Sequence, residues 1–412
     1  MQVLSGKAAE RAVDRISRRG LQPAAVEPMV RRIIRDVRRD GDRALRRYAQ
    51  RWDELDASQS LRVADAELEA AAEFLTPQLK QSLRQAAGNI RRFCEWQKPA
   101  SWMRERNGMR LGQTVLPLES VGCYVPGGRY PLVSTLLMTV IPAQVAGVGN
   151  IRVASPKPSL EVLGAAQLLG VREFYRVGGA QAIAALAYGT KSVPRVDKIV
   201  GPGNSYVTAA KKLVSFDCAI DLLAGPTEAV VLSESGTPEF IASDLVAQGE
   251  HDPEALGVFI TCTRALADAV ANEVQELTKQ NRVAQQSLRY GVVLLASSRD
   301  QARGWANRLA PEHITVDAED LPFIRNAGSI FVGDYSPQAA GDYASGPNHV
   351  LPTAGQARFR GGLSVTDFVK IVTVQQLSST GLQRIAKTVE CLAQTEGLAG
   401  HSHSIRVRCS HA

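Results

Sequence analysis

From about residue 109 onward, short apolar runs rich in β-branched residues alternate with segments of helical pattern. Strands buried on both faces give such continuous apolar runs, and strands that alternate with helices usually pair in parallel. The pattern therefore predicts an α/β fold with parallel sheets. Ten candidate strands are many for a single sheet, so we expect two α/β domains. The candidates are residues 121–125, 151–154, 174–177, 198–200, 219–223, 229–232, 257–261, 291–295, 314–316 and 329–332.

The two ends of the chain have a different pattern. Residues from about 24 to 97 have helical spacing, including 68–75 and 79–93 with Pro77 between them. After about residue 364 the pattern becomes mainly helical again and ends in a polar tail. We therefore expect helical extensions on both sides of the α/β region.

The composition is that of a globular protein and disfavours several classes. The first seven residues lack the apolar core of a signal peptide. The longest apolar stretch, 132–148, is interrupted by polar residues and Pro142, so we expect no transmembrane helix and no membrane partner. Six cysteines occur without any CxxC pair, which is typical of a reducing cytosol and excludes a thiolate zinc site. We expect a cytoplasmic protein.

Much of the net charge of +7 comes from arginine pairs in the N-terminal helical segment, at 31–32, 38–39 and 46–47. A basic helix of this kind could follow a chain of phosphates. We favour a solvated helical face in which Asp36, Asp40 and Asp42 pair with neighbouring arginines, because no aromatic residues that could stack on bases are interleaved there. We therefore expect no nucleic-acid partner.

Three glycine-containing turns follow candidate strands: 121–128, 177–181 and the stretch Gly201-Pro-Gly-Asn204. The last leads into a helix, a geometry in which free backbone N–H groups can face an anion. It is not a dinucleotide fingerprint, because Tyr206 stands where the third glycine would be. A tight turn without a ligand explains each one alone. Together, at the ends of nearby strands, they make a dinucleotide crevice plausible.

All six histidines lie at or beyond position 251, in motifs with other polar groups. Gln248 and His251 sit three residues apart, on one face of the last turn of a helix that Thr237 and Pro238 begin. Asp342, in the loop that leads to His349, could add an oxygen ligand, and His401 could add a fourth ligand. Imidazole, carboxylate and amide donors suit zinc or a similar ion. A lone histidine that caps the helix remains the alternative.

Glu312 and His313 follow Pro311 at an expected helix-to-strand turn. Adjacent side chains there point in different directions and can address two sides of one carbon atom. Such a pair could perform acid/base chemistry. Without the other motifs, an exposed polar turn would explain it equally well.

At this point the residues resemble a known family. Over nearly its whole length the chain is similar to histidinol dehydrogenases, from the segment that begins at Arg38 to the final tail. The matching stretches include Tyr124-Val-Pro-Gly-Gly, Gly201-Pro-Gly-Asn, Ala224-Gly-Pro-Thr-Glu, Gln248-Gly-Glu-His-Asp, Ala310-Pro-Glu-His, Gly341-Asp-Tyr-Ala-Ser-Gly-Pro-Asn-His and Glu396-Gly-Leu. The resemblance implies a cytoplasmic homodimer with shared active sites. Its activity would be the oxidation of L-histidinol to L-histidine through L-histidinal, with reduction of two NAD.

The resemblance also implies a role for individual residues. It places the acid/base pair at Glu312 and His313. It places one Zn²⁺ per subunit on Gln248, His251, Asp342 and His401, the last from the partner subunit. It places cofactor contacts at Tyr124, Gln181 and Asn204. It places substrate contacts at Thr227, Gln248, His251, His313, Asp342, Glu396 and His401.

The family architecture implies two interleaved Rossmann-like domains with parallel sheets and helical extensions. In this chain we expect an N-terminal arm at 1–20 and a larger domain formed by 21–118 and 229–363. We expect an NAD-binding domain at 119–228. The C-terminal segment, 364–412, is expected to complete the active site of the partner subunit.

Two positions depart from the family pattern. Gly249 stands where alanine is usual, inside the ligand-bearing turn, and could loosen that turn. Thr227 replaces a frequent serine but keeps the hydroxyl, so we expect its contact to survive.

Other functions stay open at this stage. The chain could be a dehydrogenase for a different small alcohol, although Glu396 and Asp342 suit a cationic amine. In another class, the metal and Glu312 could form a hydrolase, or the metal could be purely structural. Reduction of NAD on addition of histidinol would distinguish these alternatives.

Overall fold

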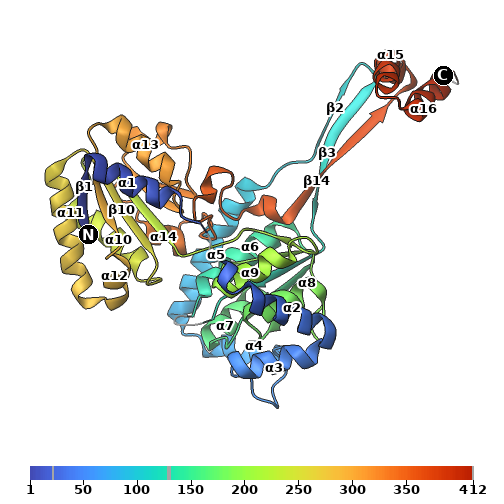
Figure 1. The fold of residues 1–412 in the computed structure, drawn as a ribbon. Helices are drawn as coiled ribbons and strands as arrows, with labels where there is room; N and C mark the ends of the chain where they lie inside the picture. The colour runs from blue at the N-terminus through green and yellow to red at the C-terminus, as the bar shows by residue number, and fades with distance from the viewer. Residues whose placement is uncertain (21–22, 128–130, 411–412) are drawn as a thin grey trace.

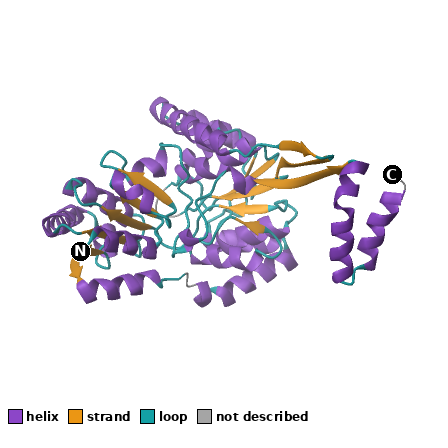
Figure 2. Cartoon of the chain, turned by 90° about the horizontal axis from the view of Figure 1, so that it is seen from above, coloured by secondary structure: helices purple, strands orange, loops and turns teal. Residues whose placement is uncertain are grey.

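The computed structural model describes residues 1–20, 23–127 and 131–410 of the chain. Two parallel sheets, each covered by helices, form two α/β domains, and a long arm projects from the body and carries the C-terminal end (Figure 1). Seen from above, the helices lie around the strands and the arm extends away to one side (Figure 2). The expected α/β class with two parallel-sheet domains is confirmed.

One domain is built on a six-stranded parallel sheet in the order β1-β11-β10-β9-β12-β13. Its strands are β1 (Gln2–Ser5), β9 (Glu228–Leu232), β10 (Leu256–Thr261), β11 (Val292–Leu295), β12 (His313–Val316) and β13 (Ser329–Val332). Successive residues of β9 point to opposite faces, because strand side chains alternate. Val230 and Leu232 join a core with helices α1 (Gly6–Ser17) and α13 (Arg299–Leu309). Ala229 and Val231 join a second core with α10 (Pro238–Gly249) and α11 (Arg264–Leu277).

The other domain has a five-stranded parallel sheet in the order β6-β5-β4-β7-β8. Its strands are β4 (Ser120–Tyr124), β5 (Asn150–Ala154), β6 (Glu173–Tyr175), β7 (Lys198–Val200) and β8 (Ala219–Ile220). One face packs against α2 (Glu27–Asp40), α3 (Asp42–Trp52), α8 (Gly179–Tyr188) and α9 (Ser205–Val214). The opposite face packs against α4 (Asp65–Phe74), α5 (Pro77–Gln97), α6 (Val133–Ala146) and α7 (Leu160–Leu168).

The N-terminal helices therefore lie on a different domain from the one expected. We grouped 21–118 with 229–363, but the apolar faces of α2 to α5 pack around the five-stranded sheet. The first residues, in contrast, add β1 and α1 to the six-stranded sheet. An amphipathic pattern fixes which face of a helix is buried, yet it does not say against which sheet.

The projecting arm is a three-stranded antiparallel sheet that ends in two helices (Figure 1). It consists of β2 (Trp102–Arg106), β3 (Met109–Pro117), β14 (Val369–Leu377), α15 (Ser379–Thr395) and α16 (Ala399–Ser410). The mainly helical pattern expected after 364 is confirmed for α15 and α16 but missed β14. Most residues of this strand are exposed, so it lacks the continuous apolar run that marks the buried strands.

The ten strand candidates all correspond to observed strands, β4 to β13, with small differences at the ends. The remaining helices are α12 (Arg282–Ser287) and α14 (Gln338–Tyr343). Short 3₁₀ turns occupy Pro23–Ala25, Thr278–Gln280, Ala318–Phe323, Gln356–Arg358 and Val365–Phe368. In the part of the chain that the structure describes, no helix is both long and apolar enough to cross a bilayer.

Candidate active site

A pocket of about 190 Å³ opens between the two domains. Its walls come from the N-terminal ends of β9 and β12, the last turn of α10, the short helix α14, and the start of α6. Six of the residues expected at the site line it together: Thr227, Gln248, His251, Glu312, His313 and Asp342. Positions far apart in the sequence therefore meet in one cavity.

Glu312 enters this cavity at the turn that joins α13 to β12. The helix ends at Ala310 in a left-handed conformation, with φ 46°, and Pro311 prevents its continuation. Oε2 of Glu312 accepts hydrogen bonds from the Thr227 hydroxyl at 2.7 Å and from the Glu228 backbone N–H at 3.0 Å. Burial outweighs these bonds and the attraction of His313, and it raises the pKa of Glu312 to about 7. A carboxyl of this pKa can exchange a proton near neutral pH.

His313 is the first residue of β12 and is also buried. Its Nε2 lies 3.4 Å from Oδ1 of Asp342, and its ring stacks on Phe331 with the ring centroids 5.9 Å apart. Nδ1 is 3.7 Å from Oε2 of Glu312 and is buried without a hydrogen-bond partner among the residues that the structure describes. Burial disfavours the imidazolium, but the neighbouring Glu312 and Asp342 carboxylates raise the pKa of His313 above its ordinary value. One ring nitrogen is thus left free to accept or give a proton.

Gln248 and Asp342 hold each other across the pocket. Nε2 of Gln248 donates to Oδ2 of Asp342 at 2.9 Å, and both side chains are buried. Burial acts to raise the pKa of Asp342, but the hydrogen bond and charge of His313 hold it below the usual value. His251 follows the end of α10 and also lines the cavity. The expected helix through Gln248 is confirmed, with Pro238 as its first residue.

Gln248, His251 and Asp342 share the pocket and carry atoms of the kinds that bind metal ions. Amide oxygen, imidazole nitrogen and carboxylate oxygen converge here, and this donor chemistry suits zinc. Among residues 1–20, 23–127 and 131–410, no group of three or more His, Cys, Asp or Glu side chains could hold a metal ion. Of the residues expected to bind zinc, Gln248, His251 and Asp342 thus line one pocket, and only His251 and Asp342 are of these four residue types.

Glu396 and His401 do not reach this pocket. Glu396 follows α15 and His401 lies in α16, at the far end of the projecting arm (Figure 1). Both side chains are exposed. Glu396 and His401 are therefore separated from the pocket of their own chain.

A second pocket of about 640 Å³ adjoins the first and shares Thr227 and Thr353 with it. Asn204 lines it and caps α9, since its Oδ1 accepts from the backbone N–H groups of Tyr206 and Val207 at 3.1 Å. This part of the sheet is the point where strand order reverses, with β4 between β5 and β7. Nucleotides bind at such points in many α/β proteins.

The two other expected cofactor residues are buried beside this point. The Tyr124 hydroxyl accepts from the Gly179 backbone N–H at 3.0 Å, and Nε2 of Gln181 donates to Asp53 at 3.2 Å. Oε1 of Gln181 is buried without a partner among the described residues. Gly128, the last glycine of the first expected turn, lies outside the described part of the chain.

Several residues at the site were given no role from the sequence. His349 lines the pocket; its Nδ1–H donates to the Asp342 carbonyl at 2.7 Å, and burial lowers its pKa, which favours the neutral ring. On α10, one turn before Gln248, burial raises the pKa of Asp244 to about 6. Arg19 forms a buried ion pair with Glu228, whose Oε1 also accepts from the Ala354 backbone N–H at 2.8 Å. The motif around His349 pointed to the first of these, whereas Asp244 and Arg19 carry no sequence signal.

The fold has two parallel-sheet domains, and the pocket between them holds a buried carboxylate–imidazole pair beside side chains of the kinds that bind metal ions. A larger pocket adjoins it. These features define an enzyme of the two-domain α/β class. Comparisons with known proteins identify the family. The sequence model of the family described as histidinol dehydrogenase matches residues 16–409. The chain therefore belongs to the histidinol dehydrogenase family.

Individual relatives agree with this assignment. The chain is 47% identical over 392 residues to a histidinol dehydrogenase from Methanothermobacter thermautotrophicus, covering 91% of this chain and 92% of the relative. It is 45% identical over 399 residues to one from Geobacter sulfurreducens, covering 93% of each. The crystal structure of histidinol dehydrogenase from Elizabethkingia anophelis is similar with a TM-score of 0.95 and 34% identity, over 100% of this chain and 98% of that one.

Proposed function

We propose that this protein catalyses the NAD-dependent, four-electron oxidation of L-histidinol to L-histidine through L-histidinal, with one zinc ion per subunit. The observation that carries the proposal is the buried Glu312–His313 pair, which faces Gln248, His251 and Asp342 in one pocket of a chain from this family. The reaction belongs to histidine biosynthesis.

The first step removes a proton and a hydride from the alcohol. His313 takes the hydroxyl proton on Nδ1, which has no hydrogen-bond partner in the described part of the chain, while the hydride leaves for the nicotinamide. Asp342 stabilises the resulting imidazolium, because its Oδ1 lies 3.4 Å from the opposite nitrogen. A positioned general base of this kind contributes about 10²–10⁴-fold to a rate. The products are L-histidinal and one NADH.

The second step needs water, since an aldehyde has no hydroxyl from which to lose a proton. Glu312 takes a proton from water as the oxygen bonds to the aldehyde carbon, which gives the anion of the hydrate. This anion transfers a hydride to a second NAD and becomes the carboxylic acid, which releases its proton to form the carboxylate. The pKa of about 7 suits Glu312 to this task, because its ionised and neutral forms are both accessible near neutral pH.

The donor set fits zinc. The Thr227 hydroxyl has one proton and two acceptors, at 2.7 Å in Glu312 and 3.1 Å in Gln248. The shorter distance indicates that the Thr227 hydroxyl donates its hydrogen bond to Glu312. Oε1 of Gln248 therefore keeps its lone pairs available for a cation. We propose Gln248, His251, Asp342 and the His401 of a partner subunit as ligands. When bound, zinc would orient the imidazole and amine of the substrate, which lowers the entropic cost of reaction.

We further propose a homodimer with shared sites. Glu396 and His401 sit on an exposed arm that projects away from the pocket of their own chain. The arm also exposes apolar side chains, including Leu111, Ile371 and Leu392. An exposed apolar surface of this kind marks a protein contact. The active site of a second copy would receive Glu396, which would bind the substrate amine, and His401, which would bind the zinc ion.

Tyr124, Gln181 and Asn204 are proposed to contact NAD. Asn204 and the N-terminus of α9 border the second pocket, and Gln181 has a buried oxygen without a partner among the described residues. All six cysteines are free thiols, which supports a proposed location in the reducing cytoplasm.

The proposal is tested by the stoichiometry of the purified, zinc-loaded protein. Limiting histidinol should yield two NADH and one histidine. One NADH with accumulation of histidinal would contradict the second oxidation, and no NADH with folded protein would contradict the activity. The same assay repeated with NADP in place of NAD decides which cofactor the protein uses.

A further inference from the structure

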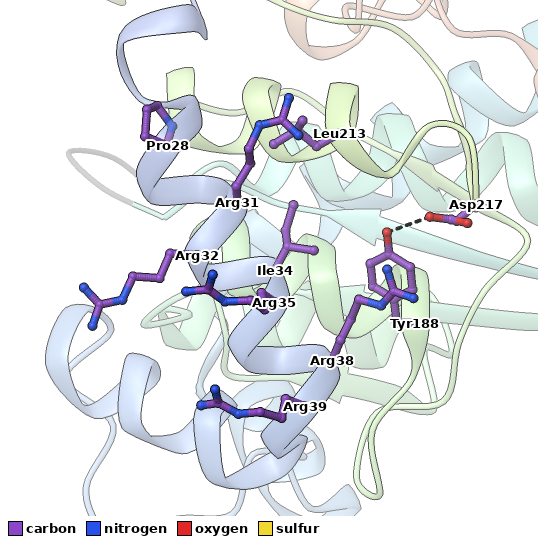
Figure 3. A pocket seen from close by; sticks show the side chains of 10 residues that line it. All are labelled: Pro28, Arg31, Arg32, Ile34, Arg35, Arg38, Arg39, Tyr188, Leu213 and Asp217. Atoms are coloured by element: carbon purple, nitrogen blue, oxygen red, sulfur yellow. Dashed lines mark hydrogen bonds between the residues drawn. The ribbon is translucent and has the colours of Figure 1, made fainter.

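The outward face of α2 consists of arginine. From position 31 to 39, every exposed residue is an arginine: Arg31, Arg32, Arg35, Arg38 and Arg39 (Figure 3). The residues between them are buried against the five-stranded-sheet domain. Helix α3 continues this surface with exposed Arg43, Arg47 and Arg51. We call these exposed residues of α2 and α3, with Trp52, the arginine surface.

The charge of this surface is less neutralised than the sequence suggested. Between 27 and 52 there are nine arginines, no lysine and four carboxylates, a net +5. Asp36 and Asp40 pair with Arg39, Arg43 and Arg47, as expected. Of the remaining two carboxylates, Asp42 is engaged outside the surface, and Glu27 is shared between a residue outside it and Arg31.

Asp42 was expected to pair with a nearby arginine, but it instead accepts hydrogen bonds from the Ser192 hydroxyl at 2.6 Å and backbone N–H at 3.1 Å. Glu27 forms an ion pair with Lys212 and a longer one with Arg31. In the described part of the chain, Arg32, Arg35 and Arg38 have no carboxylate partner within 4.0 Å. Their charge is therefore available to an anion.

Aromatic rings lie beside these arginines: Tyr48 and Trp52 from the same stretch of sequence, and Tyr188 from a distant helix. Tyr188, from α8, lies under the Arg38 guanidinium, 4.4 Å from its carbon to the ring centroid, and donates to Asp217 (Figure 3). Tyr48 and Trp52 are stacked with centroids 4.9 Å apart, and Trp52 is 39% exposed. The expectation that no stacking aromatic accompanies these arginines is therefore wrong, because α3 itself carries Tyr48 and Trp52 and the fold adds Tyr188.

Two hollows flank α2. One, of about 880 Å³, has Ile34, Leu213 and Tyr188 in its lining, with Arg31 and Arg38 on its rim. The other, of about 600 Å³, lies between α2 and α3 and is lined by five arginines with Tyr48 and Trp52. In Figure 3, Arg32 and Arg39 point to one side of α2 and Arg38 to the other. Arginines that diverge in this way suit an extended polyanion better than one small anion.

We propose that the arginine surface binds single-stranded nucleic acid. Residues four positions apart on a helix are separated by about 6 Å along its axis, which is close to the distance between successive phosphates of an extended nucleic-acid strand. Arginine is the preferred partner of phosphate because its planar fork donates two parallel hydrogen bonds. Trp52 and the Arg38–Tyr188 pair provide flat surfaces on which bases stack. None of these residues lines the active-site pocket, so binding is separate from the proposed oxidation.

The test measures fluorescence anisotropy of a labelled uridine oligonucleotide of about 20 nucleotides at several salt concentrations. The triple variant Arg32→Gln/Arg35→Gln/Arg38→Gln should weaken binding at least tenfold and reduce the slope of log K against log salt by about 2. The control variant Arg84→Gln/Arg282→Gln/Arg289→Gln removes the same charge from exposed positions elsewhere. It should bind like the unmodified protein, and equal loss in both variants would overturn the proposal.

A second variant separates nucleic acid from phosphate alone. Trp52→Leu should weaken binding of the oligonucleotide about fivefold or more, because a stacking surface is lost. It should leave binding of inorganic polyphosphate unchanged, because polyphosphate has no bases. If Trp52→Leu affects neither ligand, the surface binds phosphate only and the nucleic-acid assignment is wrong. A deoxyribose oligonucleotide in parallel tells whether RNA is preferred.

Discussion

Oγ1 of Thr227 lies 2.7 Å from Oε2 of Glu312 and 3.1 Å from Oε1 of Gln248, so one hydroxyl joins the proposed base to a proposed zinc ligand. Because Thr227 directly precedes β9 and Glu312 directly precedes β12, the pairing of these two adjacent strands fixes their separation. The site is therefore built at the end of a rigid sheet, where small displacements of either side chain are opposed by the strand ladder.

Replacing Thr227 with valine should impair the base while keeping the shape of the side chain. The hydroxyl bond lowers the pKa of Glu312 against the effect of burial, so its loss should raise that pKa further, by about one pH unit. A carboxylate base works only when ionised, so the rate of histidinal oxidation falls as pH drops through this pKa. The variant's pH–rate profile should move to higher pH.

The unmodified protein should lose rate below about pH 7 in the same assay. Thr227→Ser, which retains the hydroxyl, is the matched control and should keep the original profile. If Thr227→Val and Thr227→Ser have the same inflection, the hydroxyl does not tune Glu312.

Removal of the metal should abolish turnover, and zinc should restore it. Two of the four proposed ligands are histidines, and imidazole binds metal only in its neutral form, so affinity should weaken in acid. The measurement is activity and bound zinc after dialysis against a chelator, followed by titration with zinc. Full activity in metal-free protein would show that Gln248, His251, Asp342 and His401 do not form a required site.

Two inactive variants should complement each other if the arm completes the site of a partner. His251→Ala damages the pocket, whereas His401→Ala damages the arm. In a mixed dimer, one site receives an intact pocket and an intact arm. Partial activity should therefore return after subunits exchange. Continued inactivity after exchange has been verified would mean that each site is formed by one chain.

The ion pair between Arg19 and Glu228 should stabilise the fold beside the site. Side-chain exposures of 18% and 4% mean that removing one partner leaves a largely buried charge uncompensated. Glu228→Gln should therefore cost about 3 kcal/mol, measured as the change in free energy of unfolding of the cooperative unit that contains β9. The double variant with Arg19→Met should recover part of this loss. A single variant as stable as the parent would show that the pair contributes little.

The sequence predicted the buried architecture better than the exposed one. Most of the strands from β4 to β13 are buried runs, and burial on both faces leaves a continuous apolar signature. Only the edge strands β8 and β13 among them are largely unburied. The arm strands β2, β3 and β14 have no such burial, and the short edge strand β1 lies at the very start of the chain, so all four were missed. The docking of α2 to α5 depends on which of two apolar sheets is nearer, and a helical pattern does not encode that choice.

The candidate site was also predicted only in part from the sequence. Gln248 and His251 were related by helical spacing, and both line the pocket, but His251 lies just beyond α10, which ends at Gly249, and not in its last turn. Their meeting with Glu312, His313 and Asp342 depends on strand order, and it followed from family resemblance. Asp42 was assigned to neighbouring arginines because local pairs are all that a sequence shows. Its actual partner, Ser192, is brought near by packing of α3 on α8.

The central claim, that Glu312 activates water while His313 accepts the alcohol proton, is tested most directly by rapid-mixing kinetics of the two half-reactions. Glu312→Gln keeps the size of the side chain but removes the base. Starting from histidinal, NADH formation should slow by about 10²–10⁴-fold, whereas the first NADH from histidinol should change much less. His313→Asn should instead slow the alcohol step. Equal slowing of both half-reactions in Glu312→Gln would contradict the account and leave Glu312 a structural or electrostatic role.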